Sequence, residues 1–105
     1  MVKRQTLIPR TEVRVQVRIS LKLCGKDING KEFDETTSTE NVSISAFMCG
    51  CVAALQKDSI VDVYIVRGLD KLVGKARMVR SEPRQGASTL YAFRFVEKTG
   101  EWILK

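Results

Sequence analysis

Apolar and polar residues alternate strictly over a run of residues within the first third of the chain. From Val13 to Leu23 every odd position is apolar, and every even position is Arg, Gln, Ser or Lys. A period of two is typical of a strand that has one face in the core and the other in solvent. The pattern therefore predicts one long strand from Val13 to Cys24, with Arg14 and Arg18 on its solvated face.

Five further segments have strand character, and turn residues separate most of them. They cover residues 31–43, 45–55, 60–66, 72–81 and 90–96. The apolar segment 45–55 is also long enough for a helix, but Gly50 at its middle favours a strand. Asn29-Gly30 suits a two-residue hairpin turn, in which both central residues need positive φ, so the first two strands are expected to pair antiparallel.

Six strands without a predicted helix indicate an all-β fold. In the last segment, the aromatic residues Tyr91, Phe93 and Phe95 alternate with residues expected to face outward. Trp102 follows near the end and is expected to pack on a rim of the fold. Such a pattern favours a small six-stranded antiparallel barrel, because closure removes the unpaired sheet edges.

Length and composition restrict the classes of protein further. A chain of 105 residues with 44% hydrophobic and 29% charged residues fits one soluble domain with a modest core. Neither a membrane span nor a secretory signal is expected from its apolar runs. Histidine is absent, which excludes histidine-dependent triads and most zinc hydrolase sites within this chain. With no phosphate loop, nucleophile elbow or paired-carboxylate motif, we expect a binding protein without metal or cofactor, and not an enzyme.

The three cysteines do not form a recognisable metal or redox motif. Cys49 and Cys51 are two residues apart, which on a strand places both on one face, and Cys24 is distant in sequence. The favoured interpretation is that they are small buried hydrophobic residues in a reducing cytoplasm.

Positive charge is concentrated at the N-terminus. The chain has a net charge of +6, and residues 1–22 alone hold six basic residues and one acidic residue. Such a patch attracts anions, which include nucleic acid, phosphorylated small ligands and acidic lipid surfaces, or it only keeps a solvated strand soluble.

Two short segments resemble the motifs of the PilZ domain family. Pro9-Arg10 stands just before the first predicted strand, where the family has an RxxxR loop, and Asn41-Val42-Ser43-Ile44-Ser45-Ala46 resembles its [DN]xSxxG motif. The resemblance extends over the predicted strands to Trp102. It implies a single PilZ-like domain over 1–105, with a flexible basic arm at 1–11 and a barrel at 12–105.

The resemblance also implies a ligand, the bacterial second messenger cyclic diguanylate (c-di-GMP). Arginine forks match phosphates bidentately and stack on bases, whereas an amide and a hydroxyl can hydrogen-bond a guanine edge. The residues implied to bind the ligand are Arg10, Asn41, Ser43, Arg4 and Ala46. The domain would be a cytoplasmic bacterial signalling receptor or adaptor, acting on a further protein partner without entering a membrane.

Two departures from the family pattern leave alternatives open. The first arginine of RxxxR is replaced by Thr6, for which Arg4 is a substitute, and the glycine is replaced by Ala46. The formal match Arg10-xxx-Arg14 is set aside because Arg14 falls within the strand alternation. The first alternative is a PilZ-like adaptor that binds proteins and no nucleotide. The second is a basic barrel that binds nucleic acid, which the lack of aromatic residues from Val13 to Cys24 argues against.

Overall fold

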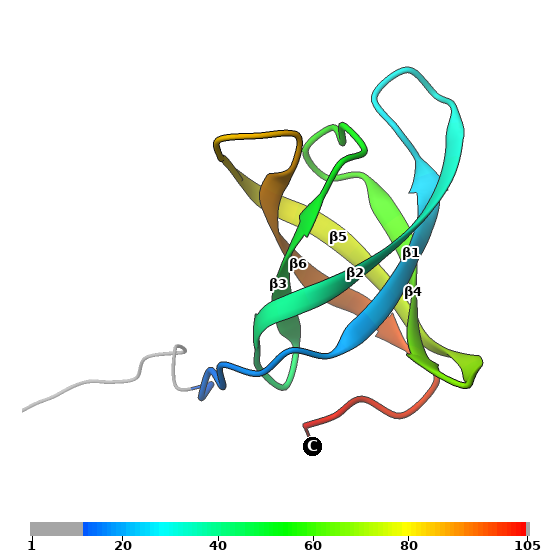
Figure 1. Ribbon diagram of the computed structural model, residues 1–105. Helices are drawn as coiled ribbons and strands as arrows, with labels where there is room; N and C mark the ends of the chain where they lie inside the picture. The colour runs from blue at the N-terminus through cyan, green and yellow to red at the C-terminus, as the bar shows by residue number, and fades with distance from the viewer. Residues whose placement is uncertain (1–11, 105) are drawn as a thin grey trace, which may run out of the picture.

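The computed structural model describes residues 12–104, which form six strands and no helix (Figure 1). The strands are β1 (Ser20–Lys26), β2 (Glu32–Val42), β3 (Ala46–Cys51), β4 (Ile60–Arg67), β5 (Leu69–Pro83) and β6 (Thr89–Lys98). All neighbours are antiparallel, and the sheet closes in the order β1-β2-β3-β6-β5-β4. The predicted six-stranded antiparallel PilZ-like barrel is therefore confirmed. The predicted arm at 1–11 lies outside the described residues.

Alternating side chains of the strands fill the barrel. Phe47 and Phe93 are fully buried and stack with ring centroids 5.1 Å apart. The alternation predicted for β6 is confirmed, since Tyr91 and Phe93 point inward whereas Arg94 is exposed. Neighbouring outward positions are therefore free to build a surface site.

Both cysteines of β3 belong to the same core. Cys49 and Cys51 are buried, free thiols, as predicted, and Cys24 is half-buried. A hydrogen bond with Cys51, together with burial, raises the pKa of the Cys49 thiol well above its ordinary value. Both inward thiols of β3 thus serve as small core side chains.

The β1–β2 hairpin forms at the predicted Asn29-Gly30 pair, but with a different turn. Of these two residues, only Gly30 has positive φ, at 80°. The Gly30 amide donates to the Asp27 carbonyl oxygen, and Asp27 Oδ1 accepts from the amides of Asn29 and Lys31. The Asp27 amide donates to the Lys31 carbonyl oxygen, so the loop is longer than two residues. Since the Asp27 side chain satisfies the amides of Asn29 and Lys31, Asn29 needs no left-handed conformation.

The long first strand predicted from Val13 is wrong in its first half, because β1 begins only at Ser20. Thr39 of β2 ends the ladder: its Oγ1 accepts from the Ile19 amide at 2.9 Å and donates to the Val17 carbonyl oxygen at 2.6 Å. Between residue 12 and this point the described chain has one isolated bridge, between Val15 and Val42. Val13, which the alternation assigned to the core face, is 72% exposed.

The chain after β6 covers one end of the barrel (Figure 1). Trp102 is 5% exposed there and packs on Phe47 and Phe95, with centroid distances of 5.6 and 4.9 Å. Its Nε1 donates to the Ser43 carbonyl oxygen at 2.8 Å. The aromatic cluster therefore fixes the β2–β3 turn, which carries the second motif.

Candidate ligand-binding groove

A groove of about 270 Å³ lies on the outside of the barrel, across strands β2, β3, β6 and β5. Its walls include three arginines, two small residues and one amide side chain. The lining residues are Arg14, Asn41, Ala46, Phe47, Met48, Val79, Arg80, Ala92, Phe93 and Arg94. No acidic residue lines it among the described residues, so the groove is suited to an anion.

Strand register explains why the surface is hollow here. Asn41 is opposite Met48, Met48 is opposite Ala92, and Ala92 is opposite Arg80, so four strands contribute one outward row. In the next row Ala46 is opposite Arg94. Directly opposed residues on antiparallel strands share a face. The two alanines therefore leave space between longer side chains.

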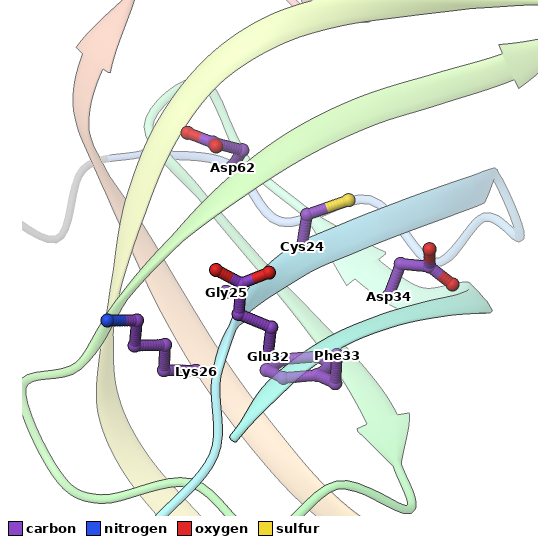
Figure 2. A pocket seen from close by; sticks show the side chains of 7 residues that line it. All are labelled: Cys24, Gly25, Lys26, Glu32, Phe33, Asp34 and Asp62. Carbon is purple, nitrogen blue, oxygen red and sulfur yellow. The ribbon is translucent and has the colours of Figure 1, made fainter. Parts of the chain in front are cut away.

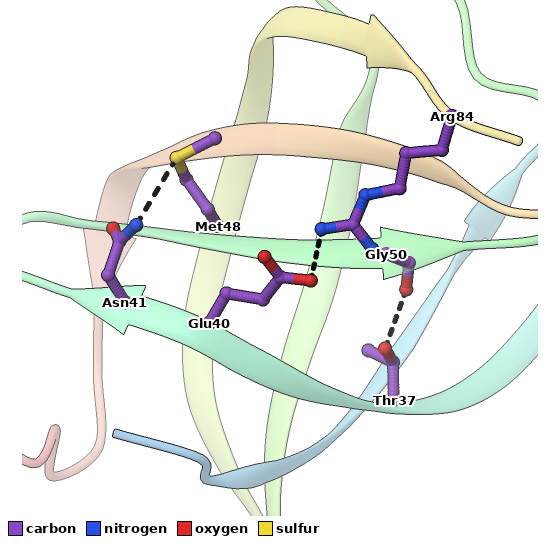
Figure 3. Close-up of polar contacts among 6 residues, drawn as sticks. All are labelled: Thr37, Glu40, Asn41, Met48, Gly50 and Arg84. Carbon is purple, nitrogen blue, oxygen red and sulfur yellow. Dashed lines mark hydrogen bonds and ion pairs between the residues drawn. The ribbon is translucent and has the colours of Figure 1, made fainter. Parts of the chain in front are cut away.

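Weak polar contacts order the floor of the groove. Asn41 Nδ2 lies 3.5 Å from Met48 Sδ, a contact that Figure 3 draws as a dashed line, and Arg80 Nη2 lies 3.9 Å from the same sulfur. Sulfur is a poor acceptor, so a ligand can take over these donors at little cost. Figure 3 also shows Arg84 paired with Glu40. Because of this ion pair, Arg84 is not available to a ligand in the groove.

Glu12 joins the segment before β1 to the β2–β3 turn. Its Oε1 accepts from Ser43 Oγ at 3.0 Å, and both of its oxygens lie 2.8 Å from Ser45 Oγ. Arg94 Nη1 donates to the same Ser45 hydroxyl at 3.0 Å. The segment that carries Arg14 is thereby held against the motif, and the chain continues from there into the predicted arm.

Hydrogen bonding favours the charged form of Glu12. Donation by Ser45 Oγ and then by Ser43 Oγ lowers the pKa of the Glu12 carboxyl, and the charge of Arg94 lowers it further. The contact is therefore made by a carboxylate at neutral pH.

The predicted site residues fall into three groups. Asn41 and Ala46 line the groove, and Ser43, which is 5% exposed, directs its hydroxyl to Glu12. Arg4 and Arg10 lie outside the described residues. Ala46 does not have positive φ and pairs regularly with Arg94, so alanine fits the backbone at the position where the PilZ pattern has glycine.

Sequence reasoning missed the three arginines of the groove. Arg14 was assigned to a solvated strand face, but it stands before β1 and lines the groove. Arg80 reaches its position through a register shift between Met78 and Arg80. The only sequence signal was the outward placement of Ala92 and Arg94 in the β6 alternation.

A second, wider hollow of about 690 Å³ lies at the β1–β2 hairpin end and has the opposite charge (Figure 2). Glu32, Asp34 and Asp62 line it together with a single base, Lys26. Burial raises the pKa of the Cys24 thiol, which lies between the acids. Carboxylates repel phosphate, so an anionic ligand is directed to the arginine-lined groove.

Comparison with known proteins supports the fold. No family model matches the chain, and no curated protein matches it. A solved structure, that of the Bacillus subtilis inhibitor of motility (MotI/DgrA), matches with a TM-score of 0.64 at 11% sequence identity. The match covers 89% of this chain and 44% of that one, so the chain spans less than half the length of MotI/DgrA. Over residues 12–104, no helix could cross a membrane.

Proposed function

We propose that this barrel binds c-di-GMP as a bacterial, cytoplasmic signalling receptor or adaptor, and that it has no catalytic role. The observation that carries the proposal is the convergence of Asn41 and Ala46 with Arg14, Arg80 and Arg94 on one groove. Guanidinium groups supply phosphate donors and stacking planes, and the Asn41 amide supplies a donor and an acceptor for a guanine edge.

The residues proposed to form the arm precede Glu12 in the sequence. Arg10 precedes Glu12 by two residues, and two residues span at most about 7 Å of chain. Glu12 itself is bonded to Ser43 and Ser45. The short chain length between Arg10 and Glu12 would let Arg10 reach a ligand in the groove. Arg4 precedes Glu12 by eight residues, and that length would also let it reach the ligand. Binding would order the arm, which a further protein partner would then recognise.

The groove suits a bound nucleotide better than a threaded nucleic acid strand. Its two aromatic residues, Phe47 and Phe93, are core rings with 1% and 0% exposure. Single-strand binders need exposed rings on which bases stack. Base stacking here would rest on the arginine planes.

A PilZ-like adaptor without nucleotide binding is the second candidate. One observation favours it: the Ser43 hydroxyl, implied to bind ligand, is already used by Glu12. In that case the groove arginines would contact acidic groups of a partner protein.

Fluorescence of the single tryptophan provides a direct test. Trp102 is hydrogen-bonded to Ser43, so ligand at the motif changes its surroundings. Titration with c-di-GMP is expected to give a saturable change that Asn41→Ala weakens and that single-stranded DNA does not reproduce. Absence of any change up to millimolar c-di-GMP, confirmed by calorimetry, would favour the adaptor.

A further inference from the structure

We propose that Arg80 and Arg94, on the wall of the barrel, are phosphate-binding residues of this site and replace the arm arginine that is absent at Thr6. The inference rests on the proposed function and deepens it. It assigns a role to two residues that lie in neither of the two motifs.

Arg80 and Arg94 lie side by side on one wall of the groove. Arg80 and Arg94 stand on neighbouring strands, β5 and β6, and both line the groove with Asn41 and Ala46. Ala92 is opposite Arg80, and Ala46 is opposite Arg94. Each guanidinium therefore stands beside a small residue, with open space at its side for a ligand group.

Neither Arg80 nor Arg94 forms a strong ion pair within the described residues. Arg80 Nη2 lies 3.6 Å from Glu82 Oε2, and both side chains are 53% exposed, so this ion pair is worth little. Arg94 donates to a neutral hydroxyl, Ser45 Oγ, and the Glu12 carboxylate on the other side of that hydroxyl acts on Arg94 through its charge and forms no direct ion pair with it. A phosphate oxygen would offer each guanidinium a charged acceptor, and charge-assisted hydrogen bonds are roughly twice as strong as neutral ones.

The two phosphates of the ligand need enough arginines to neutralise their charge. The PilZ pattern supplies two arginines from the loop before the first strand, whereas this chain has Thr6 at the first of these positions. Two phosphates still require cationic donors. Arg80 and Arg94 supply them from strands, whose side chains need less ordering on binding than those of an arm.

Calorimetric titration of c-di-GMP into four single variants tests the inference. Arg80→Ala and Arg94→Ala are expected to weaken binding by about tenfold or more each, since each removes a charged donor. Arg94→Lys is expected to bind more tightly than Arg94→Ala but more weakly than the parent protein, because lysine keeps the charge and lacks the forked donors of the guanidinium group. Arg67→Ala, at the exposed end of β4 and away from the groove, is the matched control and is expected to bind like the parent protein.

A thermal melt of every variant shows that the barrel is intact. If the parent protein binds and both Arg80→Ala and Arg94→Ala bind equally well, this inference is overturned while the proposed function stands. If the parent protein does not bind, the proposed function fails and the inference fails with it. Adding Thr6→Arg to Arg94→Ala is expected to restore affinity; no recovery would contradict the replacement.

Discussion

Ser45 Oγ lies 2.8 Å from each carboxylate oxygen of Glu12, and this contact joins the entry of the chain to the turn between β2 and β3. The bridge between Val15 and Val42 continues the attachment toward β1. Glu12 thus acts as a positioning residue: it holds the segment before β1 against the β2–β3 turn, beside the groove.

Removing the Glu12 side chain is expected to loosen this attachment without unfolding the barrel. In Glu12→Ala, the Val15 amide, which donates to Val42, is expected to exchange its hydrogen about two- to fivefold faster, because an exposed polar contact is worth at most about 1 kcal/mol. Hydrogen exchange of residues 12–19 measures this. Glu32→Ala, at the other end of β2, is the control, and equal rates in both variants would contradict a positioning role.

The same contact is expected to depend on pH. Since hydrogen bonds from Ser45 and Ser43 lower the folded-state pKa of Glu12, the contact contributes fully above the ordinary pKa of a glutamate side chain. It is lost as the pH falls from there through the lowered value. Amide chemical shifts of Ser45 followed from pH 7 to pH 3 report this titration. Glu12→Gln is expected to abolish it, and an unchanged titration in that variant would assign it to another group.

Periodicity located the strands but could not say whether each segment had a partner. Val13 and Val17 keep the alternation of β1 but lie outside its ladder, and Val15 has only an isolated bridge with Val42. Thr39 Oγ1 bonds the backbone of Ile19 and Val17 at this point. A side chain that replaces strand pairing leaves no mark on the hydrophobic pattern. Arg14 accordingly lies before β1, whereas Pro9-Arg10 still aligns Thr6 with the first arginine of the RxxxR loop.

The candidate site was predictable only where it lies in one continuous segment. Asn41 and Ala46 belong to one motif, and the groove contains both. Arg80 and Arg94 come from two other strands, and a register shift after Met78 brings Arg80 opposite Ala92. Register of this kind depends on the closed sheet, so residue types alone could not show that these arginines converge.

Restoring the family's glycine at position 46 is expected to destabilise the barrel. Ala46 has no positive φ and lies in the β3–β6 ladder, so Ala46→Gly adds only freedom to the unfolded chain. The cost is about 0.5–1 kcal/mol, or a drop of a few degrees in Tm. Thermal unfolding measures it. A higher Tm for the glycine variant would mean that alanine is strained at this position.

Trp102→Phe is expected to destabilise the fold while keeping an aromatic ring between Phe47 and Phe95. The substitution leaves the Ser43 carbonyl oxygen without the bond from Trp102 Nε1, which costs about 1–3 kcal/mol at a buried position. Urea unfolding measures the loss. The neighbouring, more exposed Ile103→Ala is the control, and stability equal to that of the parent protein in Trp102→Phe would contradict a structural role for this bond.

If the arm and the groove bind one ligand together, Arg10 is needed for full affinity. We predict saturable heat when c-di-GMP is titrated into the parent protein, and a dissociation constant about 10- to 150-fold higher in Arg10→Ala, the value of one charged hydrogen-bonding group. Identical isotherms for the two proteins, or no heat from the parent protein, would show that the arm and the groove do not share a ligand.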